Sequence, residues 1–417
     1  MPTEKLYWRD PFATAFEATA RRGDFQGRAS IVLDRTLFYP EGGGQLADMG
    51  TLALGDRAIA IADVQIDDDG VIHHLADDGV DLKAVPELGA GAAARGAIDP
   101  VRRRDHMAQH TAQHMLSRAL VEVAKADTVS ARLGATSCTL DVDAAAVSDA
   151  DLARAEDLTN AVVRNDVVVR DLFPTADELA AMKLRRAPKV SQGVRVVDVD
   201  GFDLTPCGGT HCTRTGQIGA VSIVATERYK GKMRVSFHAA GRALAYARAH
   251  QNALAGLARD LTCGPLEVAS AIAKLRGELK ARLDALSSAR GELVALLTDR
   301  ALRDHPPSEG GTTPIVIARE RDDVPSLRAL AGRLASRDDV VALCASRDEA
   351  SGDLLVVVQR GARARFDAGA WFKRASAASG GRGGGKPDRA EGRFPARITV
   401  EELAKSCPLL EPGASNA

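Results

Sequence analysis

The stretches HTAQH at residues 110–114 and CGGTH at residues 207–211 decide how this chain folds around its most distinctive side chains. Each stretch carries two metal-binding side chains four positions apart. On a helix, positions four apart project from one face, so His110 and His114 can bind one ion. The two glycines between Cys207 and His211 favour a tight loop. Together the two pairs predict a tetrahedral Zn²⁺ site with nitrogen and sulfur ligands.

Two neighbouring residues compete for these roles. His106 lies four positions before His110 on the same face of the expected helix, so spacing alone also allows His106 and His110 as the ligand pair. Cys212 could replace Cys207, but it is adjacent to His211, and adjacent side chains are poorly placed to chelate one ion. The prediction therefore rests on the combination of residues and not on any single histidine.

The composition is that of an ordinary globular protein. The chain has 417 residues, 45% of them hydrophobic and 27% charged, which allows roughly two to four domains. It has no apolar run of about 18 residues and no secretory signal, so we expect no membrane span. Six scattered cysteines are too few for a disulfide framework, and we expect a cytoplasmic location.

Charge is balanced over the whole chain but not locally. The net charge is −1, yet residues 360–393 carry nine Lys and Arg against three acidic residues, and residues 227–242 carry five against one. Two basic segments in a neutral chain favour an anionic partner.

The pattern of apolar residues predicts an α+β multidomain protein. Residues 1–97 show short apolar stretches broken by Gly and Asp pairs, which predict a small β-barrel or sandwich. Residues 98–245 predict helices packed on an antiparallel sheet, the first helix starting at Asp99-Pro100.

The second half of the chain divides into a helical part and an α/β part. Residues 246–308 predict a helical spacer, because Ile272, Leu279, Leu286 and Leu293 repeat every seven positions. That seam either lies on its own domain or forms a homodimer through the 266–300 helix. Residues 309–417 predict an α/β domain with a glycine-rich loop at 379–386.

These motifs resemble the editing domain of alanyl-tRNA synthetase and its free-standing AlaX-type relatives. Two further stretches support the resemblance. FYPEGGGQ at 38–45 is similar to the family's glycine-rich barrel motif, and TGQIG at 215–219 follows the Cys/His loop as it does in the family. The stretch GGGKPDRA at 383–390 resembles the DHHA1-type domain of that synthetase. The resemblance spans barrel, editing core, helical spacer and C-terminal domain, and the absence of an aminoacylation half favours the long free-standing form.

The resemblance implies an aminoacyl-tRNA deacylase. Its substrate would be tRNA for alanine wrongly charged with serine or glycine, and its metal ligands would be His110, His114, Cys207 and His211, not His106. The family's motif glutamine corresponds to Gln45. Gln113 departs from the Thr found in many synthetase relatives. The basic DHHA1-type segment predicts tRNA contacts by three residues: Arg382, Lys386 and Arg389.

Recognition of serine requires polar partners for its hydroxyl group. Gln45, Thr111 and Ser130 are the candidates for these catalytic roles. Zinc would either activate water, with one ligand such as Cys207 displaced, or only orient the substrate. Two alternatives stay open: a deacylase of another mischarged tRNA, and a non-catalytic RNA-binding protein stabilised by zinc.

Overall fold

The computed structural model describes residues 2–89, 91–188, 190, 193–307 and 311–407. The chain forms two compact units, Met1–Asp260 and Leu261–Ala417. The domain boundary expected between residues 308 and 309 lies outside the described residues. No helix in the described part of the chain has the length and apolar character needed to cross a membrane.

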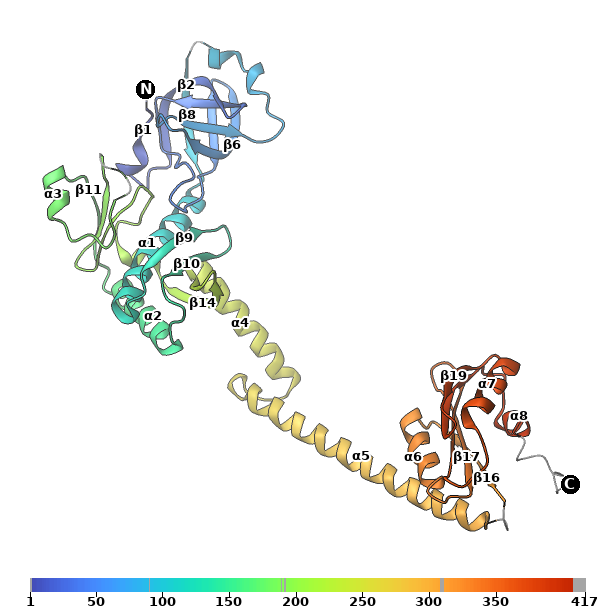
Figure 1. The fold of residues 1–417 in the computed structure, drawn as a ribbon. Helices are drawn as coiled ribbons and strands as arrows, with labels where there is room; N and C mark the ends of the chain where they lie inside the picture. The colour runs from blue at the N-terminus through green and yellow to red at the C-terminus, as the bar shows by residue number, and fades with distance from the viewer. Residues whose placement is uncertain (1, 90, 189, 191–192, 308–310, 408–417) are drawn as a thin grey trace. The chain divides into compact units, whose positions relative to one another are not determined.

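The N-terminal region of the first unit is a closed barrel of six antiparallel strands (Figure 1). Its interior is filled by aliphatic and aromatic side chains, among them Ile31, Leu52 and Phe38. Of the two architectures that the sequence allowed, the chain adopts the barrel. In order around the barrel the strands are β2 (Ala15–Phe25), β3 (Arg28–Leu33), β7 (Ile72–Ala76), β6 (Arg57–Ile66), β5 (Gly50–Leu54) and β8 (Ala92–Ile98). Beside it, β1 (Glu4–Lys5) pairs with β4 (Arg35–Thr36).

Helix α1 (Pro100–Ala124) follows the barrel and begins where the sequence predicts. The Asp99 carboxylate accepts hydrogen bonds from the backbone N–H groups of Val101 and Arg102, and Pro100 occupies the first turn. Lys125 ends the helix in the left-handed conformation. Most of the middle of α1 is buried, so its polar residues need partners within the fold.

A four-stranded antiparallel sheet packs on α1 and on α2 (Asp149–Arg164). Side chains of the sheet alternate between a buried face and a polar outer face, as the period of two requires. Leu140, Val235 and Phe237 form part of the core between sheet and helices. In order the strands are β14 (Val221–Tyr229), β15 (Lys232–Ala239), β10 (Cys138–Val142) and β9 (Thr128–Leu133).

A smaller sheet holds the second metal motif. It has the order β11 (Val169–Leu172), β12 (Val196–Val199) and β13 (Asp203–Pro206), with α3 (Ala176–Ala181) in the connection between β11 and β12. The first unit ends with α4 (Ala240–Asp260).

The second unit begins with the long helix α5 (Val268–Asp304). Its C-terminal part packs on α6 (Val324–Leu334), where Ala301 joins a buried cluster. Upstream, the seven-residue apolar repeat is largely open to solvent: Leu279 is 61% exposed and Leu286 is 49% exposed.

A five-stranded sheet forms the body of the second unit, with one helix layer on each face. Along β17, Val340, Ala342 and Cys344 face the α6 side, whereas Val341, Leu343 and Ala345 face α7 (Ala368–Ser379). This three-layer arrangement is the expected α/β domain. In order the strands are β16 (Thr313–Glu320), β17 (Val340–Arg347), β18 (Leu354–Arg360), β20 (Arg389–Phe394) and β19 (Arg382–Gly385); α8 (Val400–Lys405) follows.

Half of the glycine-rich stretch expected as a loop at 379–386 is a strand, β19, which corrects the sequence prediction. Arg382–Gly385 pairs with β20 as the edge of the sheet. Phe372 lies so close above the Gly383–Gly392 pair that a Cβ on either glycine would come within 3 Å of its ring. The glycines are therefore needed for packing of an aromatic ring on the strand backbones, which composition alone does not reveal.

Candidate metal centre

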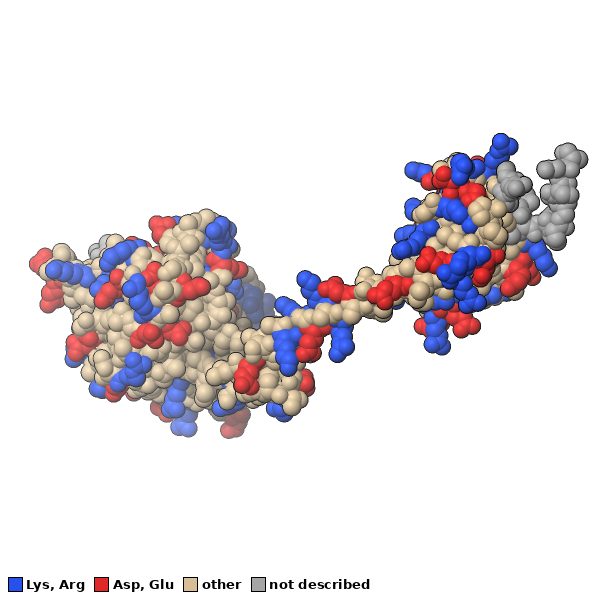
Figure 2. Space-filling model, turned by 90° about the horizontal axis from the view of Figure 1, so that it is seen from below, with Lys and Arg blue, Asp and Glu red and all other residues tan. Residues whose placement is uncertain are grey.

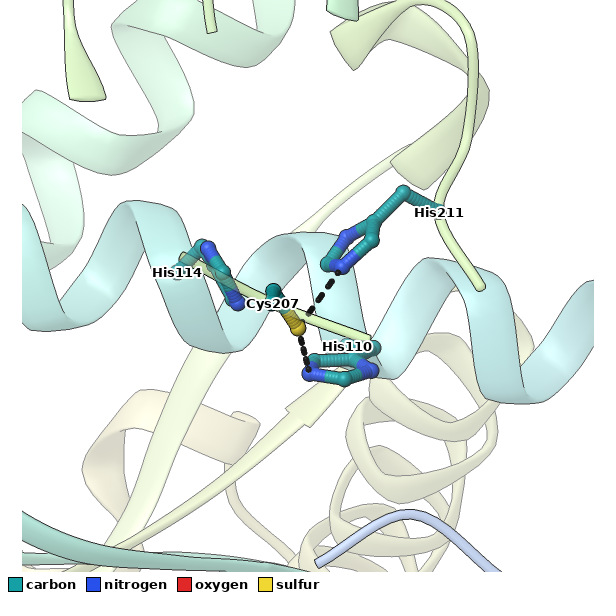
Figure 3. A group of neighbouring side chains, drawn as sticks. All are labelled: His110, His114, Cys207 and His211. Atoms are coloured by element: carbon teal, nitrogen blue, oxygen red, sulfur yellow. Dashed lines mark hydrogen bonds between the residues drawn. The ribbon is translucent and has the colours of Figure 1, made fainter. Parts of the chain in front are cut away.

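The four expected ligands meet in the interior of the first unit (Figure 3). His110 and His114 project from one face of α1, one turn apart. Cys207 and His211 come from the loop that follows β13, where Pro206 ends the strand. The ligand atoms of all four side chains lie within 4.8 Å of one another.

The donor set and its spacing fit a tetrahedral ion such as zinc. The Cys207 Sγ atom lies 3.4 Å from the Nε2 atoms of both His110 and His211. Bonds of about 2.0–2.3 Å to a tetrahedral zinc place neighbouring ligand atoms roughly 3.3–3.8 Å apart. Both ring nitrogens of His114 are buried without a hydrogen-bond partner among the described residues. Because buried polar atoms are normally satisfied, this ring is in place for an ion.

The electrostatics of the cluster favour a thiolate at Cys207 and neutral rings at His110 and His211. Although burial opposes it, the neighbouring Cys207 and Asp203 raise the pKa of His114. Burial lowers the pKa of His110, and it lowers the pKa of His211 well below its ordinary value. Burial alone would raise the pKa of the Cys207 thiol, but the three surrounding imidazoles lower it well below the usual range. Neutral imidazoles beside a thiolate are the ligand forms that bind a metal ion.

Gln45 orients the His110 ligand through a hydrogen bond to its Nδ1 atom. Its Oε1 atom accepts hydrogen bonds from His110 Nδ1 at 2.7 Å and from the Thr210 backbone N–H at 3.1 Å, and its amide group donates to Thr210 Oγ1 at 2.9 Å. With the Nδ1 proton of His110 engaged, the Nε2 atom is free for the ion. Gln45 is fully buried, and its amide links the loop between β4 and β5 (the barrel loop) to both metal motifs.

The other two histidines also have polar neighbours. Thr111 Oγ1 lies 3.3 Å from His211 Nδ1 and accepts a hydrogen bond from the Cys212 backbone N–H. Asp203 Oδ2 lies 3.6 Å from His114 Nδ1 and is paired with Arg185, 2.7 Å away at its other oxygen. Although burial opposes it, hydrogen bonding and the charge of these partners lower the pKa of Asp203. A carboxylate behind a histidine ligand orients the ring and raises its basicity.

Arg195 fixes the loop that carries Cys207. Its guanidinium donates to the carbonyl oxygens of Cys207 and Gly209 at 2.9 and 2.7 Å and pairs with Asp171 at 2.6 Å. A Cβ on Gly209 would lie 2.2 Å from the His110 ring, so only glycine allows this approach.

Buried contacts also fix the barrel loop that carries Gln45. Buried Arg103 of α1 pairs with buried Asp48, which also accepts a hydrogen bond from the Tyr39 backbone N–H at 2.7 Å. Breaking such a pair typically costs about 3–5 kcal/mol. Gly44 has a φ of +89°, and a Cβ there would lie 2.4 Å from the Ala131 carbonyl oxygen of β9. These constraints place Gln45 beside the metal ligands.

The remaining expected residues lie outside the cluster. His106 is buried but does not join the four ligands, and Cys212 is a buried thiol whose pKa burial raises to about 11. Ser130 differs from expectation: it lies on the outer face of the four-stranded sheet, where its hydroxyl donates to Asp141 at 2.7 Å. The face opposite α1 cannot supply a side chain to the metal centre. Arg382, Lys386 and Arg389 are exposed on the β19–β20 hairpin.

Sequence reasoning missed three residues of this site: Asp203, Arg195 and Thr210. Asp203 and Arg195 had no distinguishing spacing, because their partners are far along the chain. Thr210 stood inside the CGGTH motif, and its position between two ligands was the only available signal.

Three family descriptions match parts of this chain. Residues 194–236 match the threonyl and alanyl tRNA synthetase second additional domain, which includes Cys207 and His211. Residues 13–94, in the barrel, match the class II (A) tRNA synthetases, and residues 312–407 match the DHHA1 domain. In fold and site the chain is therefore similar to domains of the threonyl and alanyl tRNA synthetases.

The similarity extends over nearly the whole chain. The alanine–tRNA ligases of Halorubrum lacusprofundi and Natronomonas pharaonis are each 32% identical to it over 97% of its length, and that of Pyrococcus abyssi is 28% identical over 97%. The chain spans 43% of the length of each of these relatives. It is a relative of alanyl-tRNA synthetase that resembles the editing and DHHA1-type domains of that enzyme, as its motifs predicted.

Among solved structures, the C-Ala domain from Aquifex aeolicus alanyl-tRNA synthetase matches 24% of the chain at 24% identity. The TM-score is 0.22, so the DHHA1 assignment rests on the family match and not on this superposition.

Proposed function

We propose that this chain is an editing deacylase that hydrolyses the ester bond of tRNA for alanine wrongly charged with serine or glycine. The observation that carries the proposal is the cluster of His110, His114, Cys207 and His211, with Gln45 hydrogen-bonded to His110. Two of these ligands, Cys207 and His211, lie in the stretch similar to a synthetase second additional domain. The substrate is taken from the alanine–tRNA ligase relatives, which match across both units.

The reaction adds water to the ester carbonyl carbon and breaks the bond from that carbon to the ribose oxygen. Free amino acid and the tRNA hydroxyl leave. A zinc ion held by the four ligands would supply Lewis acidity for carbonyl polarisation or for water activation. Gln45 and Thr111 hold the rings of His110 and His211, and Arg195 holds the loop of Cys207. We assign Gln45 and Thr111 to positioning the ligands, because their polar atoms are already engaged.

Serine, unlike alanine, offers a hydroxyl group that a second site can require. Each buried polar partner that alanine leaves unpaired costs roughly 1–3 kcal/mol, so a site with one such partner separates the two amino acids by about five- to 150-fold.

Deacylation of tRNA for alanine charged with serine, glycine or alanine tests the proposal. We expect serine or glycine to be released at least about tenfold faster than alanine, and a chelator to stop the reaction until zinc is restored. Faster hydrolysis of a different mischarged tRNA would mean that the proposed substrate is wrong. Tight RNA binding with no hydrolysis, and unfolding when zinc is removed, would favour the non-catalytic alternative.

We propose that the four expected segments divide the work. Residues 1–97 and 98–245 form the editing site, 246–308 is a helical spacer, and 309–417 binds tRNA. Lys and Arg are interspersed with Asp and Glu over the face seen in Figure 2, so phosphate contacts depend on local groups rather than on a uniformly basic surface. Exposed Arg382, Lys386 and Arg389 on the β19–β20 hairpin are the proposed contacts in this segment.

The exposed apolar repeat on α5 predicts a homodimer. Ile272, Leu279, Leu286 and Leu293 are between 36% and 61% exposed, and a second copy of the helix would bury them. Changing Leu279→Lys and Leu286→Lys together should convert a dimer into a soluble monomer with unchanged metal content. Analytical ultracentrifugation at micromolar concentration checks this, and a monomeric wild-type protein would rule the dimer out.

A further inference from the structure

A second polar site lies on the outer face of the four-stranded sheet, apart from the metal ligands. It is a pocket of about 750 Å³ lined by β9, β10 and the hairpin between β14 and β15. This hairpin contains most of the basic segment 227–242, for which neither the metal centre nor the DHHA1 domain gives a role. Four cations line the pocket against the single carboxylate Asp141: Arg132, Lys230, Lys232 and Arg234.

Two of these cations are neutralised within the protein. Arg234 forms a bidentate pair with Asp141 at 2.7 and 3.0 Å and lies 3.5 Å from the centre of the Tyr229 ring. Lys232 pairs with Asp143. Arg132 and Lys230 are exposed, and neither forms an ion pair with any residue that the structure describes. They are the two charges at the pocket that remain available to an external anion.

Lys230 has a backbone conformation that is unfavourable for a lysine. It is the first residue of a two-residue turn in which Tyr229 pairs with Lys232, with φ values of +50° at Lys230 and +77° at Gly231. These angles belong to a type I′ turn, whose first position favours Asn, Asp or Gly. A long side chain in this conformation is strained, and such strain is common at functional sites. The turn itself does not need a lysine. The ammonium group of Lys230 is therefore the part of the residue for which a role has to be found.

Backbone contacts of β9 link the strand that lines the pocket to the loop that carries Gln45. The Leu133 N–H, next to Arg132 on β9, donates to the Gly44 carbonyl oxygen at 2.7 Å, and Gln45 forms a bridge with Leu133. Gln45 in turn accepts the hydrogen bond from His110. An extended anion lying along this edge of β9 would pass from the pocket to the loop beside the ligands.

From this arrangement we infer that the pocket binds phosphate groups of the RNA that leads to the ester, with Arg132 and Lys230 as its two principal contacts. The inference rests on the proposed function for the identity of the RNA, and it deepens that function by adding a phosphate site within the editing unit. The outer sheet face supplies charge, whereas α1 and the loop after β13 supply the metal ligands, so binding and hydrolysis depend on separate side chains. Ser130, which lies in this pocket, belongs to the phosphate site rather than to the metal centre.

Binding of uncharged tRNA for alanine by the full chain tests the inference without requiring hydrolysis. The test variants are Lys230→Asn, which suits the turn better than lysine does, and Arg132→Gln. We expect each to raise the Kd about three- to tenfold and the pair to raise it about ten- to fiftyfold, with the salt dependence of binding falling by roughly 0.7–0.9 per cation removed. The kcat for a mischarged tRNA at saturation should stay within about twofold while KM rises.

Arg28→Gln with Arg57→Gln is the matched control, because it removes the same charge from exposed barrel positions that form no ion pair with the residues that the structure describes. A double pocket variant whose Kd stays within about twofold of this control would overturn the inference. A fall in kcat at saturation with unchanged Kd would also overturn it. If the wild-type protein hydrolyses no mischarged tRNA but its tRNA affinity still depends on Arg132 and Lys230, the proposed function fails and the phosphate site stands.

Discussion

Replacing Cys207 by alanine should remove the metal from the folded protein. The purified chain should hold about one zinc ion, and Cys207→Ala should lower that occupancy to roughly a tenth, because the thiolate is the only negatively charged ligand of the four. Deacylation should fall by about two to three orders of magnitude. Metal analysis of the purified variant, beside single-turnover deacylation, measures both effects.

His106→Ala is the matched control for this prediction. His106 precedes His110 by one turn and is equally buried, but it lies outside the ligand group. The control should therefore keep the metal and most of the activity, with a loss only of stability. A chain that loses its metal with His106→Ala and keeps it with His114→Ala would show that the ligand assignment is wrong.

The folded state should survive loss of the ion. The core between α1, α2 and the four-stranded sheet contains Met115, Leu116, Leu140 and Phe237, all inaccessible to solvent, and this core does not depend on the ligands. Circular dichroism of Cys207→Ala should show the wild-type helix content. Gross unfolding would instead assign the metal a mainly structural role.

Much of this fold is readable in the sequence because its signals are local. Asp99-Pro100 marks the start of α1, Ser148 caps α2, and Gly264-Pro265 separates α4 from α5. Each is a capping or breaking signal that acts over a few residues. The alternation along β15 is equally local, because buried and outward side chains alternate from Lys232 to Ala239.

Elements fixed by distant contacts were harder to predict. Strands β9 and β13 have weak sequence signals. Strand β13 is only four residues long and ends in proline, and β9 has an exposed outer face that weakens its apolar pattern. The glycine-rich edge strand β19 looks like a linker until Phe372 is seen to pack over it. In these cases tertiary packing, not local preference, determines the structure.

The residues of the candidate metal site also fall into two groups, those that local spacing predicts and those that depend on distant contacts. Histidine and cysteine ligands follow from spacing, because a helix and a short loop each place two of them on one ion. The residues behind them, such as Asp203 and Arg195, follow only from contacts between separate elements. Gln45 was identified from its motif but not in its role: the sequence favoured contact with the substrate, whereas its amide is bonded to His110 and Thr210.

Gln45→Ala should therefore weaken metal binding as well as slow hydrolysis. Removing Oε1 leaves the His110 Nδ1 proton and the Thr210 N–H without their acceptor, so the ring is no longer held with Nε2 toward the ion. Loss of such a partner typically costs ten- to a hundredfold in metal affinity, and we expect a loss of about that size. The deacylation rate at low zinc should fall by about ten- to several-hundredfold.

Zinc titration separates this positioning role from direct contact with the substrate. If Gln45 acts through His110, excess zinc should restore both occupancy and most of the rate of Gln45→Ala. Thr210→Val, which removes only the acceptor of the Gln45 amide, should show a smaller defect of the same kind, because Oε1 still reaches His110. Full zinc occupancy with a rate that stays low would mean that the amide contacts the ester itself. A lowered melting temperature with normal occupancy and a normal rate would leave Gln45 as a structural link between the barrel loop and the metal motifs.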